Sequence, residues 1–128
     1  MRALLDTQVF IWSNTLDPRL SPAARDILDD GANDIYLSAV TAWEIAIKYA
    51  RGRLPLPEPP QEYVEKRLAI EDLIPLAIDL PHALAVGDLP AIHNDPFDRL
   101  LIAQAQVEQL PILTSDANIA RYDVEVIW

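Results

Sequence analysis

The sequence predicts an α/β fold in which a central parallel sheet is flanked by helices on both faces. Short apolar runs alternate with stretches of helical spacing, which is the pattern of strands connected by helices. Hydrophobic residues make up 51% of the 128 residues, enough to bury a sizeable core. The chain contains no cysteine, and no apolar run reaches the ~18 residues that span a bilayer. We therefore expect residues 1–128 to form one cytoplasmic domain without a membrane segment.

Helix-start and helix-stop signals divide the first half of the chain. Ser21 followed by Pro22 is a typical helix start, and Gly31 is a typical stop. Thr41, with Glu44 three residues later, has the spacing of a capping box. The elements expected here are a strand at Leu4-Leu5, a helix opening at Val9–Trp12, a helix at Ala23–Asp30, a strand at Ile35–Ser38, and a helix from the cap Thr41 to Ala50-Arg51, ending at Gly52.

Prolines organise the second half. The four prolines between residues 55 and 60 predict a stiff surface connection, and Asp95-Pro96 opens the longest expected helix. The elements expected here are a helix at Gln61–Glu71, a strand at Ile74–Ile78, a short helix at His82–Val86, a helix from Asp95-Pro96 through Leu110, a strand at Ile112–Thr114, a helical turn at Ala117–Tyr122 and a last strand at Val124–Trp128.

The charge balance limits the class of partner. The chain has 10 basic and 20 acidic residues, a net charge of −10. This argues against a protein that holds nucleic acid through a broad basic face. Acidic residues gathered to hold divalent cations, or a surface that awaits a basic partner, both remain open.

Four acids fall at one edge of the predicted sheet. Asp6 and Asp116 lie at the carboxyl ends of two strands. Glu44 and Asp98 lie in the first turns of two helices, each of which begins at that same edge. Each acid alone has a structural explanation as a helix-start or turn residue. Together they favour a site for Mg²⁺ or Mn²⁺, whose bound water can attack a phosphodiester.

The residues around these acids also resemble a known family, the PIN-domain ribonucleases, and within it the VapC-type toxins of bacterial toxin–antitoxin pairs. The resemblance covers essentially the whole chain, and its motifs come in the family's order. The motifs are Leu4-Leu5-Asp6-Thr7, Ser38-Ala39-Val40-Thr41-Ala42-Trp43-Glu44-Ile45-Ala46-Ile47-Lys48, His93-Asn94-Asp95-Pro96-Phe97-Asp98-Arg99-Leu100-Leu101-Ile102-Ala103-Gln104-Ala105 and Leu113-Thr114-Ser115-Asp116.

The resemblance implies a single PIN-like domain and an endoribonuclease that depends on Mg²⁺ or Mn²⁺. It places Asp6, Glu44 and Asp98 in an acidic triad at the catalytic metal site, with Asp116 as the fourth acid. It also implies an RNA substrate, a homodimer and an antitoxin whose basic residues reach the acidic pocket. Neighbouring positions of the motifs have roles that the sequence leaves open: Thr7 and Ser115 as hydroxyls beside the acids, and Asp95 as a supporting acid or as the cap of its helix.

Two other classes of protein share some of these features. An aspartyl-phosphate phosphatase or response receiver also places an aspartate after its first strand. The former needs a second aspartate where this chain has Gln8, and the latter needs a late lysine, whereas the only lysines are Lys48 and Lys66. A catalytically silent module that docks a basic partner in the acidic pocket stays open, because the same carboxylates serve both purposes.

The remaining polar and aromatic candidates favour structural roles. His82 and His93 are far apart and lack cysteine partners, so we expect no zinc pair; for His93, a local hydrogen bond is favoured over contact with substrate. The three tryptophans favour core or oligomer contacts over base stacking: Trp12, Trp43 and Trp128. The basic residues between 48 and 67 fit either an RNA-facing patch or helix ends: Lys48, Arg51, Arg53, Lys66 and Arg67.

Overall fold

The computed structural model, which describes residues 1–128, places strand β1 (Arg2–Leu5) at the centre of a five-stranded sheet. The strand order is β3-β2-β1-β4-β5, and every neighbouring pair is parallel. The other strands are β2 (Asp34–Ser38), β3 (Ile74–Leu76), β4 (Ile112–Leu113) and β5 (Val126–Ile127). Leu4 pairs with Tyr36 on one side and with Ile112 on the other. The predicted parallel α/β sheet is confirmed.

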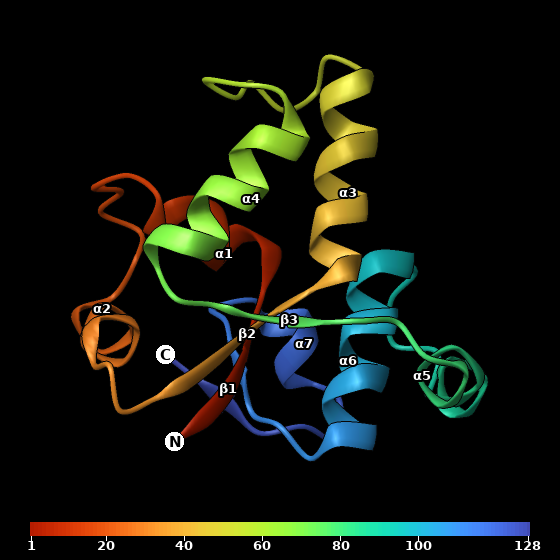
Figure 1. Ribbon diagram of the computed structural model, residues 1–128. Helices are drawn as coiled ribbons and strands as arrows, with labels where there is room; N and C mark the ends of the chain where they lie inside the picture. The colour runs from red at the N-terminus through yellow and green to blue at the C-terminus, as the bar shows by residue number, and fades with distance from the viewer.

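Helices cover both faces of this sheet (Figure 1). One layer holds α1 (Thr7–Ser13), α2 (Pro22–Asp29), α3 (Ala39–Ala50) and α4 (Pro60–Ile70), with α3 and α4 side by side. The other layer holds α6 (Pro96–Glu108) and α7 (Ala117–Ala120), together with the segment before α6 that contains α5 (Leu80–Ala85) and a 3₁₀ turn at Val86–Asp88. The longest helix, α6, has 13 residues, and no helix could cross a lipid bilayer.

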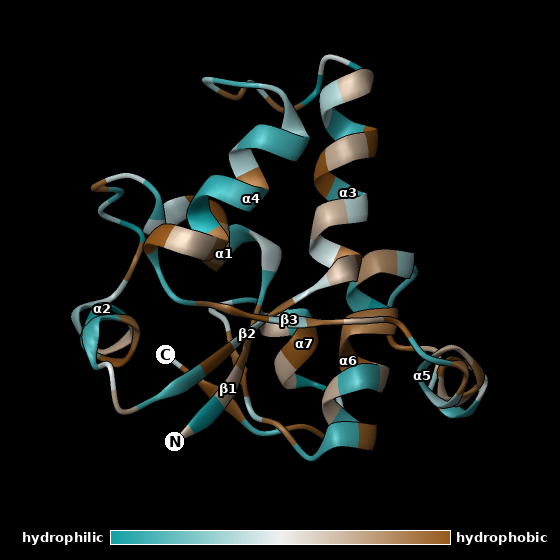
Figure 2. Cartoon of the chain, viewed as in Figure 1, coloured by the Kyte–Doolittle hydropathy of each residue, from teal (hydrophilic) through white to brown (hydrophobic).

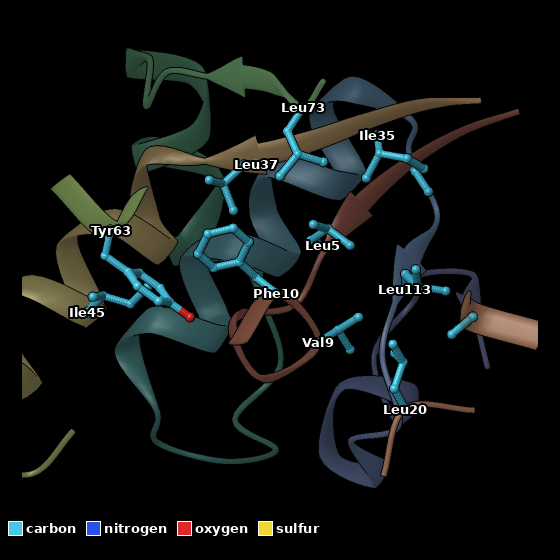
Figure 3. Close-up of a cluster of buried hydrophobic side chains, with 12 residues drawn as sticks. Leu5, Val9, Phe10, Leu20, Ile35, Leu37, Ile45, Tyr63, Leu73 and Leu113 are labelled. Atoms are coloured by element: carbon cyan, nitrogen blue, oxygen red, sulfur yellow. The ribbon is translucent and has the colours of Figure 1, made fainter. Parts of the chain in front are cut away.

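The side chains of β1 supply both layers, because successive residues of a strand point to opposite faces. Ala3 and Leu5 belong to the cluster under α1–α4, and Leu4 belongs to the cluster under α6 and α7. Figure 3 shows the first cluster, in which Phe10 meets Tyr63 edge to face at a ring-centroid distance of 6.0 Å. Figure 2 shows β3 in the brown of apolar residues and much of α4 in the teal of polar residues; the only buried residue of α4 is Tyr63.

The start of α3 differs from the sequence prediction. The helix begins at Ala39, and its cap is Ser38, whose hydroxyl accepts a hydrogen bond from the backbone N–H of Val40 at 3.0 Å. The predicted cap at Thr41 is therefore wrong, and Glu44 lies in the second turn instead of the first. Thr41 does not cap the helix because its hydroxyl is buried against that of Thr7, at 2.9 Å. A cap residue at the end of β2 lets the helix begin three residues earlier.

Several predicted ends move by a few residues, for local reasons. β3 ends at Leu76 instead of Ile78; it is an edge strand and contains Pro75, which cannot donate to a ladder. α6 ends at Glu108, two residues before the predicted end, because Gln109 adopts the left-handed conformation with φ of 55°. α5 begins at Leu80, where the sequence predicted a start at His82. The element types are as predicted.

Candidate active site

The strand order reverses direction beside β1, between β1 and β4, and this is where open α/β sheets bind ligands. Asp6 directly follows β1, and Asp116 comes shortly after β4. Thr114 joins the two strand ends: its hydroxyl donates to Oδ2 of Asp6 at 2.7 Å and accepts from the backbone N–H of Asp116 at 3.0 Å. The fold therefore holds two of the predicted acids at adjacent strand ends.

Asp6 carries a charge that its surroundings do not offset. It is only 6% exposed, and burial raises its pKa to about 6. The hydrogen bond from Thr114 opposes this rise, whereas the negative charges of Asp98 and Asp116 add to it. A carboxylate buried among like charges stays ionised at neutral pH at a cost, which a nearby cation would remove.

Asp98 lies in the first turn of α6, as predicted, and has a similar environment. Burial raises its pKa to about 6; a hydrogen bond with His93 lowers it, and the charges of Asp95, Asp116 and Glu44 raise it. Asp95 caps the same helix, because its Oδ1 accepts from the backbone N–H groups of Phe97 at 2.9 Å and Asp98 at 3.0 Å. The capping role considered for Asp95 is confirmed.

Glu44 is buried and forms an ion pair with Lys48, one turn further along α3. Burial by itself lowers the pKa of Lys48, but the hydrogen bond and charge of Glu44, with the charges of Asp95 and Asp98, outweigh burial and raise it. Lys48 therefore belongs to the acidic edge. Sequence reasoning placed it with the basic stretch, although its spacing of four residues from Glu44 was a signal for this pair.

The four predicted acids thus face one region from four elements, and their charges act on one another. As their side chains lie, no group of three or more acidic or histidine side chains could hold a metal ion. Glu44 is paired with Lys48, Asp98 with His93, and Asp6 with Thr114. The assignment of Asp6, Glu44, Asp98 and Asp116 to one metal site accordingly stays a prediction.

The neighbouring polar residues have different surroundings. The hydroxyl of Thr7 bonds to Thr41 and so ties α1 to α3, whereas Ser115 is exposed. His82 is buried; its Nδ1 accepts from the backbone N–H of Asp79, and its Nε2 lies 3.2 Å from Oε1 of Glu108. His93 has one local hydrogen bond, as the sequence favoured, and it reaches Asp98 in the site. A second hydrogen bond joins His93 to Tyr122, 29 residues away.

The basic stretch divides between structural and exposed residues. Lys66 and Arg67 approach Glu58 at 4.0 and 3.9 Å, and Arg51 and Arg53 are exposed. Arg67 lies in the last turn of α4, as the helix-end interpretation expects, and the exposed Arg51 and Arg53 are free to meet a partner.

The tryptophans also divide. Trp12 is half-buried and meets Trp128 at a ring-centroid distance of 6.0 Å. Trp43 is 46% exposed and contacts Phe97 at 4.7 Å. Trp12 thus fits the expected core role, whereas Trp43 lies at the surface.

Two of the surface hollows lie at opposite ends of α6, and their chemistry distinguishes them. The larger, about 440 Å³, lies beside Gln109 and Asp123 at the far end of α6 from Asp98. The smaller, about 300 Å³, lies at the N-terminus of α6 and is lined in part by His93, Asn94 and Arg99. Only the smaller one adjoins a predicted acid, because His93 also contacts Asp98.

A parallel sheet of this strand order, with acids at the point where the order reverses, is typical of α/β proteins that bind a ligand at the carboxyl ends of their strands. The chain belongs to the PIN domain family, whose model matches residues 3–125. The family predicted from the four sequence motifs is confirmed.

Among curated proteins, the chain is 46% identical over 69 residues to Ribonuclease VapC16 of Mycobacterium tuberculosis (strain ATCC 25618 / H37Rv). That match covers 51% of this chain and 49% of the relative, so it spans about half the length of each.

Solved structures match along the whole chain. VapBC2 from Rickettsia felis, bound to a DNA fragment from its promoter, has a TM-score of 0.74 at 16% identity, covering 100% of this chain and 99% of that one. DNA-bound VapBC from Salmonella typhimurium has a TM-score of 0.70 at 17% identity, covering 99% and 97%. FitAcB from Neisseria gonorrhoeae has a TM-score of 0.63 at 24% identity, covering 100% and 97%. At these identities the likeness establishes the fold.

Proposed function

We propose that the protein is a divalent-metal-dependent endoribonuclease that hydrolyses RNA phosphodiesters and acts as the toxin of a toxin–antitoxin pair. Membership of the PIN domain family and the 46% identity to a protein named as a ribonuclease support it. The observation that carries the proposal is the pair of largely buried acids, Asp6 and Asp98, whose pKa values burial and the negative charges of neighbouring carboxylates raise to about 6. Enzymes concentrate such groups at their sites of reaction.

The donor set fits a divalent cation. Carboxylate oxygens are the ligands that Mg²⁺ and Mn²⁺ prefer, and Mg²⁺ keeps several waters while using one or two carboxylates. It therefore does not require three side chains already gathered around one point. Asp6 and Asp98 would be its principal ligands, because they carry the least compensated charge. Glu44 and Asp116 would complete the set, and a cation near Glu44 would compete with Lys48.

The chain's own residues prepare this site. A bound cation supplies a water of lowered pKa and offsets the charge that develops on the phosphate. Thr114 holds one oxygen of Asp6, and the Asp95 cap fixes the backbone of Asp98 at the start of α6. Lys48, freed from Glu44, would be a cation positioned to meet the negative charge of RNA.

We further propose an antitoxin as protein partner and a homodimer as the working form. Similar structures include toxin–antitoxin complexes, for example one from Klebsiella pneumoniae. A net charge of −10 suits a partner with basic residues at the acidic edge. The homodimer rests on the family resemblance.

The test combines cleavage with metal binding. End-labelled RNA of mixed sequence is incubated with the parent protein, Asp6→Asn or Asp98→Asn, in Mg²⁺, Mn²⁺ or EDTA. We expect cleavage by the parent only with a divalent cation, and none by the variants. Asp26→Asn, which removes an exposed charge from α2, is the matched control and should cut like the parent.

Thermal unfolding separates the enzyme from a silent docking module. A cation at a hundredfold excess over its Kd stabilises the folded state by about 2.7 kcal/mol. The melting temperature of the parent should therefore rise by several degrees in Mn²⁺, and that of Asp6→Asn should not. A parent that binds Mn²⁺ but cuts no RNA would support the docking module. A parent that neither gains stability nor cuts RNA would contradict both the metal site and the activity.

A further inference from the structure

A chain of hydrogen bonds runs from α6 through the C-terminal part of the molecule to Asp98. Arg99 NH1 lies 3.0 Å from the hydroxyl of Tyr122, and that hydroxyl lies 2.7 Å from Nδ1 of His93. Nε2 of His93 lies 3.1 Å from Oδ2 of Asp98. His93 and Tyr122 are 29 residues apart, so their spacing in the sequence does not predict this contact. The effect of this chain on the orientation of the Asp98 carboxylate extends the proposed function and rests on it.

The direction of the chain follows from what each group can donate. A guanidinium only donates, so Tyr122 Oη accepts from Arg99. The same oxygen also accepts from the backbone N–H of His93, at 3.3 Å. With both of its acceptor positions used, the hydroxyl directs its own hydrogen to Nδ1 of His93. Nδ1 is then an acceptor, and a neutral imidazole must carry its hydrogen on Nε2.

The opposite tautomer has no such support. A hydrogen on Nδ1 would oppose the hydroxyl hydrogen of Tyr122, and the lone pair of Nε2 would face the carboxylate of Asp98. Arg99 cannot relieve this conflict, because NH1 also donates to the carbonyl of Pro90 at 2.8 Å and NH2 donates to that of Leu89 at 3.4 Å. These hydrogen bonds to two carbonyls therefore hold the guanidinium of Arg99 in place as a donor to the hydroxyl of Tyr122.

We propose that His93 is a positioning residue, held by Arg99 and Tyr122 in the Nε2–H tautomer so that it donates to Oδ2 of Asp98 and leaves Oδ1 available for a divalent cation. No hydrogen bond reaches Oδ1, whereas Oδ2 has His93 as its partner. The backbone of Asp98 is fixed separately by the Asp95 cap. Together the two interactions set both the place and the rotation of this carboxylate.

The arrangement parallels that of Asp6 across the site. There the hydroxyl of Thr114 holds Oδ2, as the imidazole of His93 holds Oδ2 of Asp98. In the proposed tautomer, each of the two acids is thus oriented by a donor without charge, which fixes the oxygen without neutralising the charge that attracts a cation. A lysine in either place would fix the carboxylate and compete with the cation.

The tautomer can be read directly by NMR of the whole protein. At pH 8, where an ordinary imidazole is neutral, ¹⁵N shifts distinguish a ring nitrogen that carries hydrogen from one that does not. We expect His93 Nε2 to be protonated and Nδ1 unprotonated in the parent, with His93→Gln used to assign its signals against those of His82. In Tyr122→Phe we expect both tautomers. A parent with hydrogen on Nδ1 would overturn the proposal, whatever the protein's activity.

Mn²⁺ affinity tests the consequence for Asp98. Removing a residue that orients a ligand typically weakens metal binding about tenfold or more, which is the change we expect for Tyr122→Phe. Tyr63→Phe is the matched control: it removes another buried tyrosine's hydroxyl, bonded to Asn14 at 2.7 Å, and should bind like the parent. His93→Gln keeps an N–H near Nε2 that needs no fixed tautomer. It should retain affinity where His93→Leu loses it, and adding Tyr122→Phe to it should change little.

The outcomes separate this proposal from the function on which it rests. If the parent binds Mn²⁺ and Tyr122→Phe binds it equally well, the hydrogen-bond chain is only structural and the positioning role is wrong. If the parent binds no Mn²⁺ and cuts no RNA, the proposed function fails, and the role of His93 toward a cation fails with it. A tenfold loss of Mn²⁺ affinity in Tyr122→Phe that is absent when His93→Gln is also present supports the positioning role, and cleavage of RNA by the same parent supports the proposed function.

Discussion

Replacing Asp6 with asparagine should stabilise the protein at neutral pH. Burial, only partly offset by the hydrogen bond from Thr114, raises the pKa of Asp6 to about 6. This is about two pH units above an ordinary aspartate, so keeping the carboxylate ionised at pH 7 costs about 3 kcal/mol of folding free energy. Asparagine keeps the shape, and its carbonyl can still accept from Thr114. Allowing about 1 kcal/mol for the incompletely paired amide, we expect a gain of about 2 kcal/mol.

The sign of the pH dependence follows from the direction of the pKa change. An aspartate with a raised pKa binds its proton more tightly in the folded state, so the parent loses stability as the pH rises from about 4 to about 7. Below about pH 3 the carboxyl group is largely protonated in both the folded and unfolded states, and most of the cost has already disappeared at pH 4. Asparagine does not titrate, so the advantage of the variant should be present at pH 7.5 and largely absent at pH 4.

Urea unfolding and thermal unfolding at the two pH values measure this difference in stability. For a chain of this size, a gain of 2 kcal/mol corresponds to a rise in melting temperature of roughly 5–10 °C. Asp26→Asn controls for the loss of one exposed negative charge and should change stability little at either pH. An Asp6→Asn variant no more stable than the parent at pH 7.5, or equally favoured at pH 4, would refute the view that Asp6 is held ionised against its surroundings.

Two substitutions test the packing around the site. Gln104→Leu should lower the free energy of unfolding by about 2 kcal/mol, because the fully buried amide forms hydrogen bonds with Ser38 and with the carbonyl of Ala77. Gln106→Leu, on the exposed side of the same helix, is the control. Equal urea midpoints for the two variants would disprove a stabilising role of the Gln104 hydrogen bonds. Asp95→Ala should cost about 1 kcal/mol through loss of the α6 cap, and Asp95→Ser should retain most of it; a circular-dichroism melt of Asp95→Ala that matches the parent would exclude the cap as a source of stability.

Local signals in the sequence were sufficient for the fold class and most elements. The Ser21-Pro22 and Asp95-Pro96 starts are both used, because a cap and a proline at the first helical position act within a few residues. Thr41 failed as a cap because two candidate cap residues lie three positions apart. The choice of Ser38 depends on the Thr41–Thr7 contact, which joins segments 34 residues apart.

The candidate site shows the same division. That Asp6, Glu44, Asp98 and Asp116 lie at one edge could be predicted, since it depends on which end of each element they occupy. Their partners could not be predicted in the same way. Thr114 reaches Asp6 over a separation of 108 residues, and Tyr122 reaches His93 only because the C-terminal segment returns past α6. Lys48 is the exception, because a helix brings residues four apart together.

The central strand has a consequence for how the molecule opens. Because Ala3 and Leu5 pack into one cluster and Leu4 into the other, neither layer of helices can detach without uncovering a strand on which the opposite layer depends. Local openings of the sheet therefore approach the free energy of complete unfolding at β1, and its amides should be among the slowest to exchange with solvent deuterium. Asp6 is attached to this slowest part of the chain. Asp116 begins a helix of only four residues, where fraying is cheap. The two strand ends that Thr114 joins thus differ in rigidity: we expect Asp6 to be held rigidly, and Asp116 to be able to move relative to it.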